Sequence, residues 1–240
     1  MYFDQSEWEV RCEWGAQGVA ALAPVCDAIV VVDLLSFSTC VDIAAARGAL
    51  VYPYRFRDDS AARYAAELGA TLARHGREAG AGYSLSPASL RAIPAGTRLV
   101  LPSPNGATLT LATGATPTLA GCLRNARAVA LAAARFGPRI GVIAAGERWP
   151  DGGLRPAVED WLGAGAVIAH LPGARSPEAE LAHQAFASAR ADLGPILRAC
   201  GSGKELIGRG FAEDVALAAD HDRSDCAPLL IDGAYQRIKG

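Results

Sequence analysis

A carboxylate stands at the end of an apolar run, and several hydroxyl groups follow it. The run Ala28–Val32 is rich in β-branched side chains, which predicts a strand buried on both faces. Asp33 comes where that strand should end, and Ser36, Ser38 and Thr39 precede an Ala-rich helical segment. A carboxylate beside the N–H groups of a helix start suits a metal ion and an anion such as phosphate. On this segment alone, a carboxylate that only caps the helix is an equally good interpretation.

Polar side chains also follow other predicted strands. Asn105 and Gly106 form a tight turn after one strand, Asn125 follows the next, and Glu147 and Arg148 follow a third. In an open parallel sheet, ligands bind beyond the carboxyl ends of the strands. We therefore expect these groups to meet at one edge of the sheet.

Each of these groups also has an ordinary structural explanation. Asn125 is a common type of helix cap, and Glu147 with Arg148 can form a surface ion pair that contributes little to folding stability. Glu159 and Asp160 are the least ordinary, because they interrupt a helix that is otherwise apolar. Adjacent helical residues diverge by about 100°, so at most one of these two carboxylates points into a site while the other caps or faces solvent.

The elements that must position these residues alternate between strand and helix from residue 28 to about residue 170. The expected strands are Ala28–Leu34, Leu50–Tyr54, Arg98–Leu101, Pro117–Cys122 and Arg139–Ala145. The expected helices are Ser38–Arg47, Asp58–Arg74, Ala107–Ala112, Asn125–Phe136 and Pro156–His170. This alternation predicts an α/β fold, a mostly parallel sheet with helices on both faces.

The C-terminal part has a different pattern. Ser176–Cys200 has helical periodicity, Gly201–Gly203 should break it, and Asp214–Ala219 and Pro228–Ile231 are expected as short strands. A small C-terminal α+β lobe is therefore an option. With no clear linker, we expect a single domain over residues 1–240.

Composition excludes several classes of protein. Half of the 240 residues are hydrophobic and the net charge is −2, so nothing favours disorder, a nucleic-acid partner or an anionic membrane. The start lacks the pattern of a secretory signal and no apolar stretch approaches the roughly 20 residues that span a bilayer, so we expect a cytoplasmic protein. The six cysteines are scattered, with no histidine at zinc-ligand spacing, so we expect neither a disulfide framework nor a structural zinc site.

Several reaction types also fail on the residues. The histidines His75, His170, His183 and His221 lie in unrelated contexts, which disfavours Ser-His-Asp hydrolysis. A phosphoaspartyl mechanism would favour a second Asp two residues after Asp33, where this chain has Leu35. No dinucleotide or P-loop motif follows any predicted strand.

An ordered set of short motifs resembles the 2-phosphosulfolactate phosphatase family over nearly the whole chain. The matching segments are Val32–Thr39, Ser103–Gly106, Gly121–Ala126, Ala144–Gly146, Val158–Asp160 with Gly163–Gly165, and Gly210–Val215. The resemblance implies an α/β fold, a homodimer, and a magnesium-dependent hydrolase that releases phosphate from 2-phospho-3-sulfolactate, a step towards coenzyme M. No single motif is very specific; their order carries the resemblance.

On this resemblance, Asp33, Asn105, Glu159 and Asp160 fall on family motifs and are the predicted catalytic residues. Because hard oxygen donors suit Mg²⁺, we expect Asp33 with Glu159 or Asp160 to be its ligands. The predicted substrate-binding residues are Ser36, Ser38, Thr39, Gly106, Asn125, Glu147 and Arg148. Ser38 and Thr39, with their backbone N–H groups, are expected to hold the phosphate.

Departures from the family pattern leave the substrate open. Ser36 stands where the first motif usually has Arg, and Ala144 where a later motif often has Cys. The loss of a guanidinium removes a bidentate anion clamp, for which Arg148 or Arg77 is a candidate replacement. The alternatives are a phosphatase for another small phosphorylated hydroxy acid and a non-catalytic binder of an anionic metabolite on the same fold.

Overall fold

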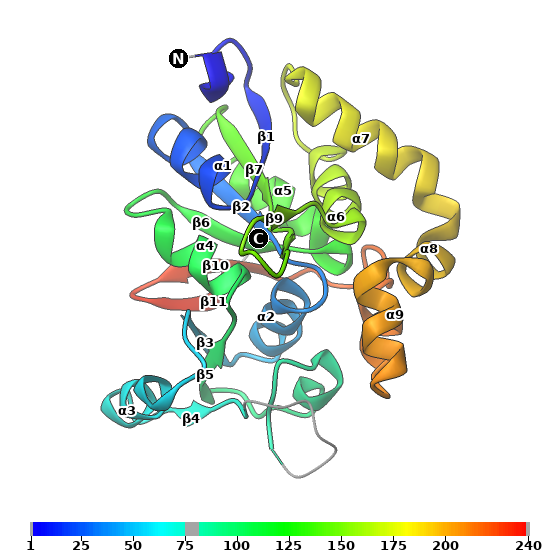
Figure 1. Ribbon diagram of the computed structural model, residues 1–240. Helices are drawn as coiled ribbons and strands as arrows, with labels where there is room; N and C mark the ends of the chain where they lie inside the picture. The colour runs from blue at the N-terminus through cyan, green and yellow to red at the C-terminus, as the bar shows by residue number, and fades with distance from the viewer. Residues whose placement is uncertain (1, 75–81, 239–240) are drawn as a thin grey trace.

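The computed structural model describes residues 2–74 and 82–238, and its largest feature is a nine-stranded sheet in the order β1-β7-β2-β6-β10-β11-β3-β5-β4 (Figure 1). Its strands are β1 (Val10–Trp14), β2 (Ala28–Val32), β3 (Leu50–Tyr54), β4 (Thr71–Leu72), β5 (Arg98–Pro102), β6 (Thr118–Gly121), β7 (Ile140–Ala144), β10 (Ala227–Ile231) and β11 (Ala234–Ile238). A separate antiparallel pair joins β8 (Glu147–Arg148) to β9 (Leu154–Arg155).

The helices connect and cover these strands. They are α1 (Gly15–Leu22), α2 (Phe37–Ala46), α3 (Asp59–Glu67), α4 (Gly106–Ala112), α5 (Ala126–Ala133), α6 (Val158–Ile168), α7 (Pro177–Ala189), α8 (Leu193–Ala199), α9 (Gly201–Gly208) and α10 (Ala212–Ala218). Within the described part of the chain, none combines the length and apolarity needed to cross a bilayer.

Strand β2 shows why the sheet is covered on both faces. All of its residues are buried. Val30 and Val32 belong to a core shared with α5 and α6, whereas Ile29 and Val31 belong to a core shared with α1 and α4. Alternate side chains of a strand point to opposite faces, so an uninterrupted apolar run requires helices on each side. The predicted α/β class and mostly parallel sheet are confirmed.

The C-terminal region corrects several element predictions. The predicted helix break is present at Cys200, where α8 has ended and the backbone is extended, but Gly201–Gly203 already belongs to the next helix, α9. Asp214–Ala219 lies largely in α10 instead of a strand. Helix α3 ends at Glu67, so the helix expected to reach Arg74 is too long. The strands β10 and β11 lie in the middle of the main sheet, between β6 and β3, and not in a separate C-terminal lobe.

The sheet brings together the ends of strands that are distant in its order. Traced through the antiparallel pairs β6–β10, β10–β11 and β11–β3, strand β5 runs opposite to β2. The segment after β5 nevertheless approaches the end of β2: the N–H of Gly106, the first residue of α4, donates a hydrogen bond of 2.7 Å to the Asp33 side chain.

Candidate active site

A pocket of about 300 Å³ opens where β2, β5 and β7 end. Among the predicted site residues, those that line it are Asp33, Ser36, Asn105, Glu147 and Arg148. Two further arginines, Arg57 and Arg209, line the same cavity. The pocket therefore combines acidic and basic side chains in one cavity.

Asp33 is fixed by the turn that follows β5. It is 7% exposed, and its Oδ2 accepts hydrogen bonds from the Gly106 N–H (2.7 Å) and from the Ser103 hydroxyl (3.4 Å). A Cβ atom on Gly106 would lie 2.7 Å from Asp33 Oδ2 and would overlap the Phe37 ring. Only glycine allows the backbone at position 106 to approach Asp33 and Phe37 so closely, and its N–H positions the Asp33 carboxylate.

Asp160 joins the ends of two adjacent strands. Its Oδ1 accepts the Leu34 N–H at 2.7 Å, just after β2, and its Oδ2 accepts the Gly146 N–H at 2.8 Å, just after β7. Burial raises the pKa of Asp160, and the nearby charges of Asp33 and Glu159 raise it further. Both carboxylate oxygens are engaged by the backbone, which makes Asp160 a positioning residue.

Glu147 contributes a second pocket carboxylate from the start of β8. The Asn105 side chain donates a 2.9 Å hydrogen bond from Nδ2 to Glu147 Oε2. Burial raises the pKa of Glu147 to about 7, with the charges of Asp33 and Glu159 acting in the same direction. Two of the predicted catalytic residues, Asp33 and Asn105, are therefore coupled to Glu147 around the cavity.

The expected pairing of Asp33 with Glu159 or Asp160 around a metal ion stays a prediction, because the geometric criterion below concerns groups of three ligands. We looked for three or more His, Cys, Asp or Glu side chains whose ligand atoms all lie within 4.8 Å of one another. In residues 2–74 and 82–238, His170, His221 and Asp222 meet this criterion. Asp33, Glu159 and Asp160 do not form such a group among the described residues. Glu159 is 3% exposed and contacts the Cys200 thiol, whose pKa is raised to about 11 by burial and then by the Glu159 charge.

Ser38 and Thr39 lie in the first turn of α2, and their hydroxyl groups bond to backbone groups of the segment that joins β2 to α2. Ser38 Oγ donates to Val31 O (3.1 Å) and accepts from Asp33 N–H (3.0 Å), while Thr39 Oγ1 donates to Leu34 O (2.8 Å). Both side chains are fully buried. Short hydroxyl side chains readily bond to nearby backbone, and here they stabilise the turn that presents Asp33.

Asn125 takes the ordinary structural role. It is fully buried, its Oδ1 accepts the Cys122 N–H at 2.8 Å, and its Nδ2 donates to Ala120 O at 3.2 Å. These bonds hold the turn between β6 and α5, and Asn125 does not line the pocket. Its assignment as a substrate-binding residue is therefore not supported by its position.

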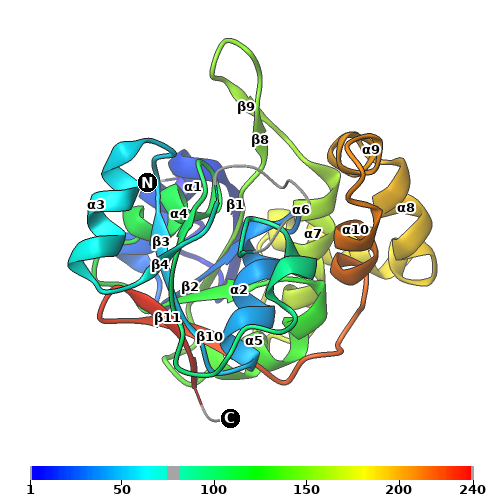
Figure 2. The same cartoon turned by 90° about the horizontal axis from the view of Figure 1, so that it is seen from below.

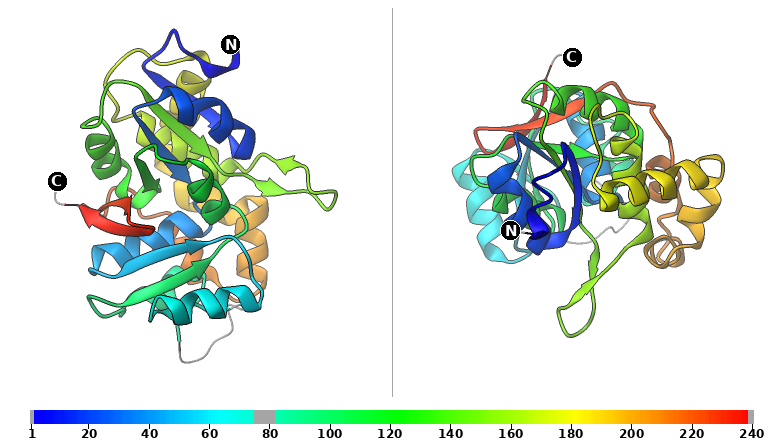
Figure 3. Two further views of the ribbon diagram at one scale, coloured as in Figure 1. Left: turned by 90° about the vertical axis from the view of Figure 1, so that its left-hand side faces the viewer. Right: turned by 90° about the horizontal axis from the view of Figure 1, so that it is seen from above.

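Of the arginines that line the pocket, Arg148 was predicted from the sequence, whereas Arg57 and Arg209 were not. Arg148 lies on β8, in a hairpin that projects from the body of the molecule (Figures 2 and 3). Arg57 comes shortly after β3, so the strand-end rule would have found it, and Arg209 directly precedes the Gly210–Val215 motif. The other candidate, Arg77, lies outside the described residues.

The Gly210–Val215 motif has a structural role beside the pocket. Asp214 Oδ1 accepts a hydrogen bond from the Ser86 hydroxyl (2.7 Å) and from the Ala88 N–H (3.0 Å). These bonds attach α10 to the short 3₁₀ helix Pro87–Leu90. Asp214 thereby fixes two segments that flank the cavity, and Leu85 and Arg209 from those segments line it.

The fold and the pocket define an α/β protein whose polar cavity lies at the carboxyl ends of its strands. The chain belongs to the 2-phosphosulpholactate phosphatase family, whose family model matches residues 20–233. A curated relative is the 2-phosphosulfolactate phosphatase of Methanothermobacter thermautotrophicus. It is 32% identical over 144 residues, which cover 60% of this chain and 61% of the relative.

Proposed function

We propose that this protein is a phosphomonoester hydrolase whose substrate is 2-phospho-3-sulfolactate. The observation that carries the proposal is the single cavity that joins the carboxylates Asp33 and Glu147 to the arginines Arg57, Arg148 and Arg209. Family membership and the name of the curated relative support the same activity.

The proposed substrate carries phosphate, carboxylate and sulfonate groups, so it needs several cationic partners. Guanidinium groups suit such anions because they donate bidentate hydrogen bonds. Ser36 lines the pocket where the family motif usually has Arg, and Arg57 and Arg209 supply positive charge to the same cavity. We therefore propose 2-phospho-3-sulfolactate as the substrate in preference to another phosphorylated hydroxy acid.

We further propose that the reaction depends on Mg²⁺. The donor set fits this ion, which takes one or two carboxylates, keeps several waters and binds substrate phosphate. Asp33 and Glu147 line the cavity, and a cation would relieve the repulsion that helps to raise the pKa of Glu147. Asp33 and Glu147 would hold the ion, while Asp160 fixes the strand ends behind them. At these carboxylates, a bound Mg²⁺ would supply positive charge to polarise a phosphoryl oxygen of the substrate and to lower the pKa of a water molecule.

The chain's own residues orient the reactants. Gly106 N–H and Ser103 hold the Asp33 carboxylate in one position, and Asn105 does the same for Glu147. The arginines bind the anionic groups and orient the ester bond. Preorganised charge of this kind stabilises a transition state without further rearrangement.

The test is phosphate release from a panel of phosphorylated hydroxy acids, measured with Mg²⁺ and after chelation by EDTA. We expect the highest kcat/KM for 2-phospho-3-sulfolactate and the loss of turnover in EDTA. Equal rates on phospholactate would favour a broader phosphatase. Thermal stabilisation by intact substrate without any turnover would instead indicate a non-catalytic binder.

We also propose a cytoplasmic homodimer that acts on the route to coenzyme M. The six cysteines are all thiols, which suits a reducing compartment. The exposed side chains Trp149 (53%) and Leu154 (45%) lie on or next to the projecting hairpin and would be covered in a dimer (Figure 2). Light scattering of wild type and Trp149→Ser tests the dimer. Cell fractionation tests the cytoplasmic location, and a search for neighbouring sulfonate-pathway genes tests the role on the route to coenzyme M.

A further inference from the structure

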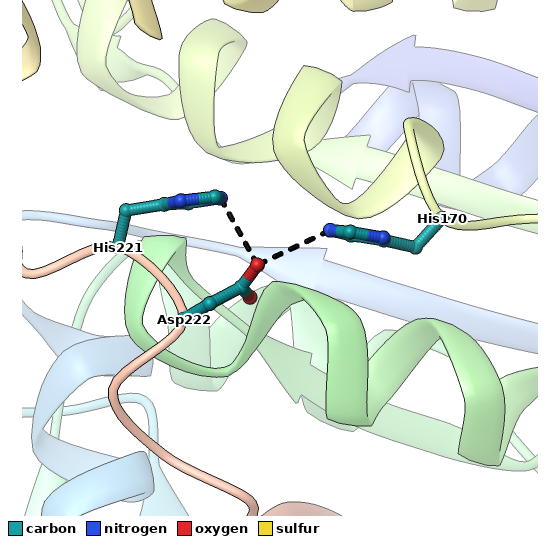
Figure 4. Close-up of side chains that lie close together, drawn as sticks. All are labelled: His170, His221 and Asp222. Carbon is teal, nitrogen blue, oxygen red and sulfur yellow. Dashed lines mark ion pairs between the residues drawn. The ribbon is translucent and has the colours of Figure 1, made fainter. Parts of the chain in front are cut away.

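His170, His221 and Asp222 form a cluster that is separate from the pocket, and none of them lines it. His170 follows α6, whereas His221 and Asp222 lie between α10 and β10. The Nε2 atoms of His170 and His221 are each 3.3 Å from the same oxygen, Oδ2 of Asp222 (Figure 4). Figure 4 shows the two rings approaching that oxygen from opposite sides.

These distances match the spacing of ligands around a small metal ion. Zinc bonds to imidazole nitrogen and carboxylate oxygen are about 2.0–2.2 Å, so adjacent ligands of a tetrahedron lie about 3.3–3.4 Å apart. Both nitrogen–oxygen separations in the cluster are 3.3 Å, and all three ligand atoms lie within 4.8 Å of one another. The spacing of the ligand atoms therefore needs little adjustment to bind an ion.

Hydrogen bonding alone leaves part of the cluster unexplained. His221 Nε2 is buried and makes no hydrogen bond with the described residues, although it faces Asp222 Oδ2. A buried polar atom in this state calls for a water or an ion as its partner. A metal ion between the two rings and the carboxylate would accept the lone pair of His221 Nε2 and so give this buried atom a partner.

The surroundings hold the ligands in place. Asp222 Oδ1 accepts the Arg127 N–H at 3.0 Å, and the Asp222 N–H donates to Leu123 O at 3.0 Å. The His221 ring packs against Phe186 of α7 with ring centroids 5.2 Å apart. Contacts of this kind orient metal ligands in advance and strengthen binding.

We propose that His170, His221 and Asp222 form a binding site for a transition-metal ion of the Zn²⁺ type, with water as the fourth ligand. Imidazole ligands favour Zn²⁺ and related ions over Mg²⁺, which prefers oxygen. The side chains are 17–29% exposed, so an ion can enter from solvent. Bound metal links the end of α6 to the segment after α10 and stabilises the packing of the C-terminal helices against the sheet.

The test is Zn²⁺ titration of EDTA-treated, dialysed protein in buffer with excess Mg²⁺, followed by calorimetry and by the melting temperature Tm. We expect one equivalent to bind with a rise in Tm, and Co²⁺ to give the visible absorption of a four-coordinate site. His170→Ala should weaken Zn²⁺ binding by about 100-fold or more, since even residues behind the ligands contribute 10–100-fold. Asp222→Asn should weaken it as well.

His183→Ala is the matched control, because His183 is also half-buried and lies near Glu180 on α7, outside the cluster. Its Zn²⁺ affinity should equal that of wild type, and so should that of the pocket variant Asp33→Asn. Metal-free circular dichroism confirms that each variant is folded. Failure of the wild-type protein to bind Zn²⁺, or equal binding by His170→Ala, would overturn the proposal whatever the phosphatase assays show.

Discussion

Glu147→Gln tests whether burial and the neighbouring carboxylates disfavour the charged form of Glu147 in the metal-free protein. Burial, followed by the Asp33 charge, raises the pKa of Glu147 from 4.5 to about 7, which corresponds to about 3.4 kcal/mol at about 1.36 kcal/mol per pKa unit. Because the side chain is partly exposed, screening reduces this to about 2 kcal/mol. A raised carboxyl pKa means that the folded state opposes ionisation. Wild-type protein therefore has this stability in full below about pH 4.5 and loses it as the pH rises through about 7.

Glutamine stays neutral, so the variant escapes this loss. In EDTA we expect Glu147→Gln to melt about 4–8 °C above wild type at pH 8, with the difference vanishing near pH 4.5. Glu67→Gln on the exposed face of α3 is the control and should follow wild type at every pH. Adding Mg²⁺ should raise the Tm of wild type at pH 8 and leave Glu147→Gln nearly unchanged. Parallel pH profiles for wild type and Glu147→Gln would show that ionisation of Glu147 does not destabilise the folded protein.

Three further substitutions test positioning and binding. Asp160→Asn retains one acceptor for the two N–H groups it now binds, so urea unfolding should show a loss of about 2–3 kcal/mol; unchanged stability would contradict its role between strands. Gly106→Ala should displace Asp33 and lower kcat by at least about 10-fold with a stability loss of about 1–3 kcal/mol, and wild-type kinetics would show that the contact is dispensable. Arg57→Ala should raise KM for 2-phospho-3-sulfolactate about 10-fold more than for a substrate with a single anionic group, consistent with the loss of one charge-assisted contact; equal effects on both substrates would argue against an anion clamp.

The alternating part of the fold was predictable because its strands carry uninterrupted apolar runs. Strand β3 has the predicted bounds Leu50–Tyr54, and β2 is buried on both faces as its β-branched residues indicate. Strand β1 was missed because Arg11 and Glu13 interrupt its apolar pattern. Arg11 is nevertheless 2% exposed, since its guanidinium donates to Trp8 O and Val25 O. Such long-range satisfaction of a buried charge leaves no local signal in the sequence.

The site was predictable to the extent that strand ends determine it. Asp33, Asn105, Glu147 and Arg148 follow predicted strands and do line the pocket. Whether a polar group faces a cavity or bonds to its own turn depends on tertiary geometry, and the sequence does not show that Asn125 bonds to its own turn. The approach of the segment after β5 to the end of β2 is likewise a property of the whole fold.

The histidines show the same limit. His170 and His221 are separated by 51 positions in the printed numbering, so no ligand-spacing rule connects them. The fold brings their rings to a common carboxylate oxygen although the helices α7–α10 separate them along the chain. The cluster became visible through three-dimensional distances alone.

The most direct test of the proposed chemistry is the kcat/KM for phosphate release from 2-phospho-3-sulfolactate by Asp33→Asn and wild type, each with saturating Mg²⁺. Asparagine keeps an oxygen that can accept the Gly106 N–H, so the turn is retained while the charge is removed. We predict that kcat/KM falls by about 100-fold or more while the circular dichroism spectrum is unchanged. Wild-type turnover by Asp33→Asn would contradict it, because the pocket would then not need the carboxylate around which it is built.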